Sequence, residues 1–337
     1  MRKKDWIVGF SIFCLGFGIL SVGASTYAAD KYRLKMQFIH TAGDIMKFHQ
    51  DFAEKVKVNT GGRIVIDTFT SGSLVPTKEM AGAVGQGTLD MAFCYGGYHS
   101  GMLDIANIEC GLPMAWGNID EATRFHLVHG FQNIAREAYA GLGVYWMTPI
   151  MEVPFLTLTK KPVRSLADLK PMKIRATATV ASILKPFGIA TVYMPAEEFY
   201  TSMATGVIDG CIYGSENGYY GLKLQEQAPY ITDMKILNPM TSAILINQKV
   251  WDSMPADLKG TLDETVKSQY TLAYFSFRSK QDAAVRQYFK REQFSPEDVA
   301  KMTTAAQQVW ETEAKKSPRA AKGIELLKAL AKEGGRL

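Results

Sequence analysis

Residues 165–213 read SLADLKPMKIRATATVASILKPFGIATVYMPAEEFYTSMATGVIDGCIY. In this stretch, short apolar runs rich in β-branched residues alternate with longer runs of helical periodicity. The runs predict strands near 172–176, 190–193 and 208–213, and helices near 178–187 and 196–204. Short strands that alternate with helices are typical of α/β proteins with a largely parallel sheet. The stretch therefore predicts an α/β fold.

The same alternation continues on both sides of this stretch. The sequence predicts strands at 32–38, 63–69, 89–95, 143–147, 153–159 and 242–247, and helices from Asp44, at 77–84 and at 119–138. Asp44 can cap its helix, and Ser295-Pro296 is a typical helix start. From Pro255 to Arg291 there is no further proline and only Gly260, which predicts one very long helix.

Composition narrows the class of protein. The chain has 337 residues, of which 47% are hydrophobic and 21% charged, so it is neither a disordered chain nor a coiled coil. Its formal charge of +5 comes without a concentrated basic face, so we expect no nucleic-acid partner. The only long apolar run lies at the N-terminus, which excludes a polytopic membrane protein.

The N-terminus reads as a cleaved signal peptide at residues 1–28. Three basic residues precede an apolar run from Trp6 to Ala24, and small residues surround Ala28. Cleavage after Ala28 predicts export to the periplasm. The alternative is a retained membrane anchor, because the run is close to the spanning length.

Three cysteines, Cys94, Cys110 and Cys211, follow the signal peptide. An odd number leaves at least one free thiol. Cys94 and Cys211 lie in apolar segments, so we expect buried, unreactive thiols, with one disulfide bridge as the alternative.

Catalytic signatures are missing from the sequence. It contains no G-x-S-x-G, Walker A, H-E-x-x-H or C-x-x-C motif, so we expect no catalytic residue and no cofactor. His126 and His129 lie three residues apart on an expected helix and could bind a metal. No carboxylate cluster accompanies them, so we expect surface or interface histidines and no metal site.

Four segments together carry a family resemblance. Residues 165–175 are similar to the family pattern s-x-x-DLKGlKiR, with Pro171 in place of glycine, and residues 195–210 resemble E-v-Y-x-AL-q-t-G-v-v-DG. Residues 87–92, followed by 111–113, and residues 247–255 complete the set. In this order the segments resemble the periplasmic solute-binding proteins of tripartite ATP-independent periplasmic (TRAP) transporters, the DctP family. The resemblance spans residues 30 to about 310.

The resemblance implies an architecture and a partner. It implies a two-lobed periplasmic-binding-protein fold with an interlobe cleft and a long helix crossing both lobes. Lobe I would comprise 29–153 plus 241–281, and lobe II 154–240 plus 282–337. The lobes would close on an organic acid, and the loaded monomer would deliver it to the small and large TRAP membrane subunits. Two alternatives remain, a module that presents its ligand to a membrane sensor and a secreted enzyme.

Arg175 is the strongest candidate site residue. By resemblance it is the family's substrate-carboxylate arginine, and a guanidinium matches a carboxylate bidentately. The alternative is a structural salt bridge. Many members carry a second polar or basic residue about twenty positions before this arginine, where this chain has Phe155. Members that bind two-oxo acids through a metal carry a Glu-Trp pair just after the Asp-Gly of the second pattern. This chain has Cys211-Ile212-Tyr213 there. A metal-bridged substrate is therefore not expected, although Glu216 and Asn217 nearby leave that possibility open.

A single arginine among aromatic residues indicates a monocarboxylate with an apolar or aromatic body. Aromatic rings bury a large area and can stack on a ligand ring. The alternative for each aromatic residue is core packing. The candidate solute-binding residues besides Arg175 are Tyr213, Phe155, Tyr95, Tyr98, Trp116 and Asn217.

Overall fold

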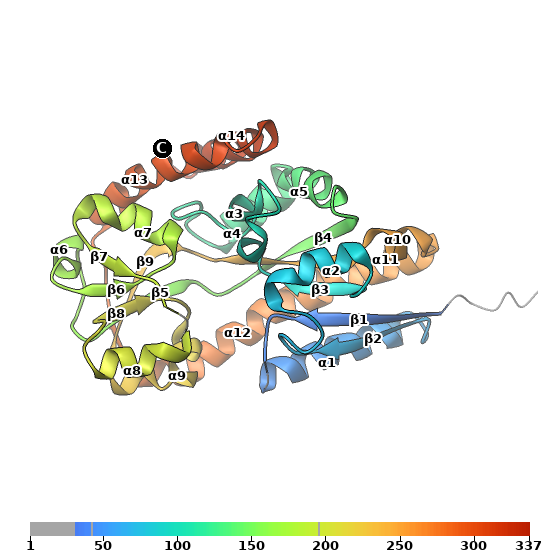
Figure 1. The fold of residues 1–337 in the computed structure, drawn as a ribbon, viewed down its shortest axis with the longest axis horizontal. Helices are drawn as coiled ribbons and strands as arrows, with labels where there is room; N and C mark the ends of the chain where they lie inside the picture. Colours follow the sequence, from blue (N-terminus) through green and yellow to red (C-terminus); the bar gives the residue numbers. More distant parts are fainter. Residues whose placement is uncertain (1–30, 42, 195) are drawn as a thin grey trace, which may run out of the picture. The chain divides into compact units, whose positions relative to one another are not determined.

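The computed structural model describes residues 31–41, 43–194 and 196–337, so the predicted signal peptide at 1–28 lies outside the described residues. The described residues form a five-stranded and a six-stranded sheet (Figure 1). The first sheet has the order β2 (Ile64–Phe69), β1 (Tyr32–Phe38), β3 (Met91–Cys94), β10 (Thr241–Asn247) and β4 (Val144–Met151). The second has the order β11 (Lys290–Glu292), β9 (Tyr230–Leu237), β5 (Phe155–Thr159), β8 (Gly210–Ile212), β6 (Lys173–Arg175) and β7 (Ala190–Val192).

Both sheets are largely parallel, as predicted, but each contains one strand that runs in the opposite direction. In the first sheet β10 runs antiparallel to β3 and β4, and in the second β5 runs antiparallel to β8 and β9. The reason lies in the connections. The chain leaves the first sheet from β4 into β5 and returns from β9 into β10, so each sheet pairs an outgoing strand with a returning one. The predicted α/β class is confirmed.

The shorter helices flank the two sheets, and most match the predicted ranges. They are α1 (Asp44–Asn59), α2 (Met80–Gln86), α3 (Ala106–Glu109), α4 (Ile119–Thr123), α5 (Phe131–Ala140), α6 (Leu166–Leu169), α7 (Ala178–Leu184), α8 (Phe199–Ala204), α9 (Glu216–Gly221) and α10 (Gln248–Ser253). Gly43, not Asp44, is the capping residue of α1. The helix expected at 119–138 is interrupted, because Gly130 adopts a φ of 90° between the π-helical turn η3 (Arg124–Val128) and α5.

One long helical segment runs from Ala256 to Tyr288, which confirms the expected long helix of 33 residues. It consists of α11 (Ala256–Glu264), the π-helical segment η7 (Thr265–Thr271), α12 (Leu272–Val285) and the 3₁₀ turn η8 (Arg286–Tyr288). The η7 segment packs against α1 and β4 of the first sheet, and α12 packs against α9 beside the second. The segment therefore contacts both halves of the fold.

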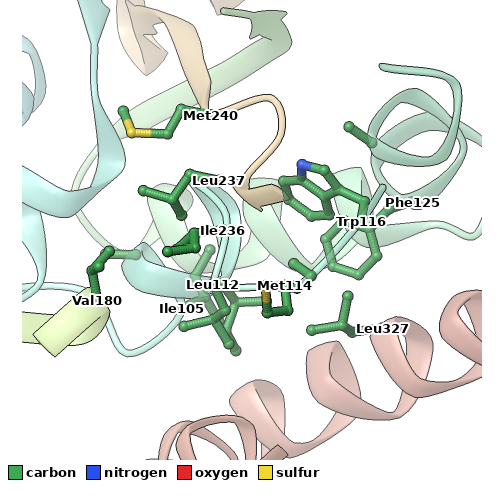
Figure 2. Close-up of a cluster of buried hydrophobic side chains, with 14 of the residues drawn as sticks. Ile105, Leu112, Met114, Trp116, Phe125, Val180, Ile236, Leu237, Met240 and Leu327 are labelled. Carbon is green, nitrogen blue, oxygen red and sulfur yellow. The ribbon is translucent and has the colours of Figure 1, made fainter. Parts of the chain in front are cut away.

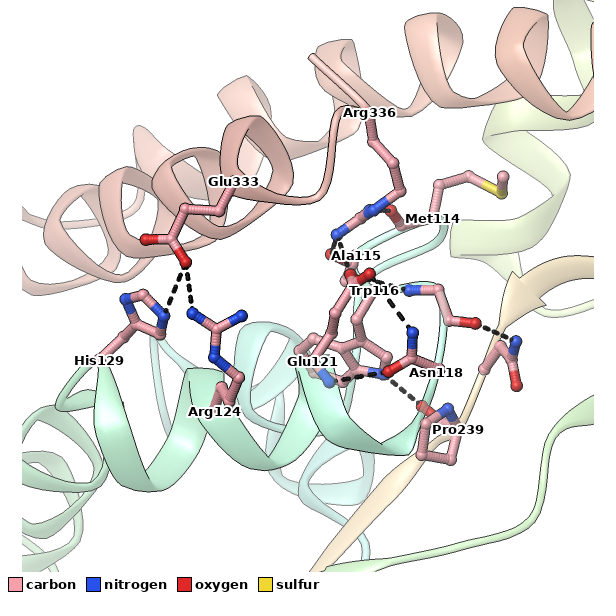
Figure 3. Close-up of polar contacts among 12 residues, drawn as sticks. Met114, Ala115, Trp116, Asn118, Glu121, Arg124, His129, Pro239, Glu333 and Arg336 are labelled. Carbon is pink, nitrogen blue, oxygen red and sulfur yellow. Dashed lines mark hydrogen bonds and ion pairs between the residues drawn. The ribbon is translucent and has the colours of Figure 1, made fainter.

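The C-terminal helices also contact elements beside both sheets. The first, α13 (Pro296–Ala314), starts at the expected cap Ser295 and packs against α7. The second, α14 (Pro318–Glu333), packs against α3 and α5. The side chain of Arg336 donates to the carbonyl oxygens of Met114 and Ala115 and pairs with Glu121 (Figure 3). Since residues 31–337 form one compact unit, the lobe boundaries stay a prediction.

Buried side chains explain the state of the cysteines. Within the described residues, Cys94, Cys110 and Cys211 are buried and free, which confirms the expectation of unbridged thiols. Burial raises the pKa of the Cys110 and Cys211 thiols to about 12, so they stay protonated and unreactive.

Among residues 31–337, apart from 42 and 195, no helix has the length and apolar character needed to cross a membrane.

Candidate functional site

Local hydrogen bonds position Arg175 at the end of strand β6. Ser165 and Asp168 form a reciprocal capping box that starts α6, just before the strand. The backbone N–H of Lys173 donates to Oδ2 of Asp209 at 2.9 Å, and β6 pairs in parallel with β7 and β8. Arg175 therefore lies at the carboxyl ends of three parallel strands, where α/β proteins bind ligands.

The Arg175 guanidinium is buried and donates hydrogen bonds to two backbone carbonyl oxygens. The residue is 5% exposed; its Nε donates to the carbonyl oxygen of Met194 at 3.0 Å and its Nη1 to that of Ile212 at 3.4 Å. Among the described residues, no carboxylate forms an ion pair with it. A buried cation without a counter-charge is unfavourable, because its lost hydration is not offset. The arrangement is suited to an anion that the described side chains do not supply.

Three aromatic rings surround the Arg175 guanidinium. Their centroids lie 5.0 Å from Cζ for Tyr193, 4.8 Å for Phe199 and 5.5 Å for Tyr213. Phe155 lies beside Tyr213, with ring centroids 6.4 Å apart. The structure therefore brings the candidates Arg175, Tyr213 and Phe155 together.

Sequence reasoning missed Tyr193 and Phe199. Tyr193 directly follows the last residue of β7, and this position at the carboxyl end of a strand could have identified it. Phe199 begins the short helix α8 and is fully buried. Its apolar spacing gave no sign that it would contact an arginine.

Tyr95 and Tyr98 come from the first-sheet side, at and within the 3₁₀ turn η2 (Gly96–His99). Their rings meet edge to face with centroids 5.3 Å apart. Desolvation raises the pKa of Tyr98, Tyr213 and Tyr193 raise it further, and the positive charge of Arg175 lowers it. Tyr98, which is 44% exposed, therefore lies within electrostatic range of Arg175, Tyr193 and Tyr213.

A cavity of about 430 Å³ lies beside this cluster. We call it the alanine-lined cavity; its lining residues are Ala176, Ala178, Ala181, Thr191, Val192 and Tyr193. It lies where β6 and β7 end, and Tyr193 contacts both the cavity and the Arg175 guanidinium.

Asn217 lies in a different cavity, of about 270 Å³, which is lined by His40, Asp44, Ile45, Asn217, Arg278 and Gln281. This cavity borders a buried polar network. Glu152 accepts hydrogen bonds from Tyr274 at 2.8 Å and Ser242 at 3.0 Å, and pairs with Arg278 at 3.5 Å. Burial lowers the pKa of His40 to about 3, so its ring is neutral at physiological pH. The network joins β4, β10 and α12.

Trp116 lies in the hydrophobic core (Figure 2). It is 2% exposed, its Nε1 donates to the carbonyl oxygen of Pro239 at 2.6 Å, and its ring packs on Phe125. The structure does not bring Trp116 to Arg175, and its surroundings match the core-packing alternative.

His126 is a core residue, not the surface or interface residue we expected. Its ring nitrogens contact the carbonyl oxygens of Ala122 and Glu109, and burial lowers its pKa to about 4. Within the part of the chain that the structure describes, no group of three or more His, Cys, Asp or Glu side chains is placed to hold a metal ion.

Residues 41–317 match the family model of the bacterial extracellular solute-binding proteins, family 7 (DctP). A solute-binding protein of Albidiferax ferrireducens is 24% identical over 218 residues, 63% of each chain. A monocarboxylate 2-oxoacid-binding periplasmic protein of Nostoc sp. is 23% identical over 208 residues, 61% of this chain and 57% of that protein. The alignments thus span less than two thirds of these relatives' length.

Solved structures share the fold. A TRAP periplasmic solute-binding protein from Rhodobacter sphaeroides, in an apo open form, has a TM-score of 0.78 at 22% identity, covering 90% of this chain and 99% of that one. Another, from Colwellia psychrerythraea with bound calcium and pyruvate, has a TM-score of 0.77 at 19% identity, covering 90% and 95%. The periplasmic-binding-protein fold expected from the sequence is confirmed.

Proposed function

Because the chain belongs to family 7 of the bacterial extracellular solute-binding proteins, the DctP family, we propose that it binds an organic acid through Arg175. Membership places it among proteins that bind small solutes rather than among enzymes. It would work in the periplasm and deliver its solute to TRAP membrane subunits.

The buried guanidinium of Arg175, for which the structure describes no carboxylate partner, carries this proposal. Arginine offers five N–H donors, and backbone carbonyls accept from Nε and from one hydrogen of Nη1. The structure describes no acceptor for the second Nη1 hydrogen or for Nη2, and this end of the guanidinium can bind both oxygens of a carboxylate. A phosphate or sulfate could use the same donors, but family relatives favour carboxylates. The Nostoc relative, for example, binds monocarboxylate 2-oxoacids.

We propose further that the solute is a monocarboxylate with an apolar or aromatic body. The surroundings of Arg175 support this, because they include the rings of Tyr193, Phe199 and Tyr213. No second arginine is described at this cluster, and Phe155 stands next to Tyr213. A second carboxylate placed among these rings would have no described cationic partner.

A thermal-shift screen of the chain from Ala29 tests the proposal. The panel pairs mono- with dicarboxylates and aliphatic with aromatic acids, each with and without EDTA. A ligand at a hundredfold excess over its Kd stabilises by about 2.7 kcal/mol, which moves the melting point by several degrees. Shifts confined to monocarboxylates support the proposal, whereas larger shifts with dicarboxylates contradict the single-arginine site.

A further inference from the structure

The alanine-lined cavity shares a wall with the anion site. One ring, that of Tyr193, lies 5.0 Å from the Arg175 guanidinium and also lines the cavity. Ala176, another lining residue, directly follows Arg175. Its backbone N–H donates to the carbonyl oxygen of Val192 at 3.1 Å, which continues the pairing of β6 with β7. A small molecule bound to Arg175 by its carboxylate can therefore place its remaining atoms in the cavity.

The lining of the cavity determines which atoms it accepts. Its lining residues are three alanines, Val192, Thr191 and Tyr193, so its polar side-chain groups are two neutral hydroxyls, those of Thr191 and Tyr193. None of the lining residues is charged, so a charged group placed there would lack a partner. The cavity is open to solvent, since Tyr193 is 70% exposed, and its volume of about 430 Å³ leaves room for a phenyl or branched alkyl group.

We infer that the alanine-lined cavity receives the body of the solute and selects among carboxylates by the size of that body. The favoured class is a monocarboxylate with a branched aliphatic or phenyl-sized body. This inference rests on the proposed function, because Arg175 must hold the carboxylate for the body to reach the cavity. Ala178 and Ala181 are the size-selecting residues, since any larger side chain at either position would occupy the space.

Calorimetric titration with propionate, 3-methylbutanoate and phenylacetate tests the inference. The variants are Ala181→Leu and Ala178→Leu; Ala178 is exposed, so its replacement should not prevent folding. Ser182→Leu is the matched control, because Ser182 is an exposed neighbour on the same helix α7 that does not line the cavity. We expect each cavity variant to lose at least tenfold in affinity for phenylacetate and less than twofold for propionate, while the control stays within twofold for all three acids.

The outcomes separate the two proposals. If the wild-type protein binds these acids and the cavity variants lose affinity equally for all of them, or not at all, the cavity is not the size selector but the carboxylate site stands. If the wild-type protein binds none of the three acids, both proposals are overturned.

Discussion

The Nε of Arg175 donates a hydrogen bond to the carbonyl oxygen of Met194 at 3.0 Å. This bond connects the end of β6 to the segment that follows β7. The bond uses Nε, the guanidinium nitrogen nearest the side-chain stem. The terminal nitrogens, Nη1 and Nη2, are therefore directed away from Met194. A guanidinium that is already held in place loses little conformational entropy when it binds an anion, which favours tight binding.

Removal of Arg175 should separate binding from stability. We expect Arg175→Met to lose about 3 kcal/mol of carboxylate binding, or about 100-fold in Kd, because two charge-assisted hydrogen bonds disappear. The melting point of the ligand-free variant should stay unchanged or rise, because an unpaired buried charge is replaced by an apolar side chain. Calorimetry and thermal unfolding measure the two effects. An unchanged Kd would remove Arg175 from the site, and Arg175→Lys tests whether charge alone suffices.

Glu109 should make stability depend on pH. Its carboxylate is buried and accepts hydrogen bonds from Trp146 Nε1 at 2.6 Å and Tyr139 Oη at 2.8 Å. Desolvation raises its pKa to about 7, against the two hydrogen bonds that lower it. Between pH 4.5 and 7 the unfolded chain loses this proton while the folded chain keeps it. We therefore expect this group to lower the free energy of unfolding by up to about 3 kcal/mol across that window, with no further change above it.

Urea unfolding at a series of pH values measures this slope, and Glu109→Gln is the control. The glutamine variant loses a hydrogen bond, so only the change of slope counts and not the absolute stability. Equal slopes for the two proteins would show that Glu109 does not titrate in this window.

The pair Glu152–Arg278 should behave as a coupled unit. Both side chains are mostly buried and they meet at 3.5 Å, with Tyr274 bonded to each. Replacing either one by alanine should lower the free energy of unfolding by about 3 kcal/mol, because the remaining charge is left buried and unpaired. The double variant should lose clearly less than the sum of the two. Urea unfolding of all four proteins completes the cycle, and strictly additive losses would contradict the coupling.

Trp116 should matter for stability and not for binding. Trp116→Phe removes the hydrogen bond to Pro239 and should cost about 1 kcal/mol, whereas Trp116→Ala should cost about 3–5 kcal/mol through the cavity that it leaves. The affinity of Trp116→Phe for an acid that binds the wild-type protein should stay within twofold. A selective loss of affinity in a stably folded Trp116→Phe variant would restore Trp116 as a wall of the site.

Local patterns in the sequence predicted most of the fold. Strand β1 was predicted at its exact bounds, and the cap at Ser295 was correct, because alternation and capping are properties of a few neighbouring residues. Strands β9 and β11 were missed. β9 reads YITDMKIL and mixes polar with apolar residues on both faces, and β11 has three charged or polar residues, so neither has a strand pattern. Their pairing depends on distant segments.

The cluster of side chains around Arg175 was predicted in part for the same reason. Arg175 stood out through a motif, and Tyr213 and Phe155 through their places relative to it. Tyr193 and Phe199 contact Arg175 only because β6, β7 and β8 lie side by side, which no local pattern shows. Trp116 and Asn217 are close to motif residues in the sequence. In the fold, however, Trp116 lies in the hydrophobic core and Asn217 lines a different cavity.

The π-helical segment Thr265–Thr271 has a consequence for protein engineering. A π-helical turn holds one residue more than an α-helical turn, so it takes up an inserted residue without rotating the helix on either side. Deleting one residue here, such as the exposed Ser268, would convert the segment to ordinary α-helix and keep α11 and α12 in phase. Within the long helix, this is the place where the chain can change its length without losing the contacts at both ends.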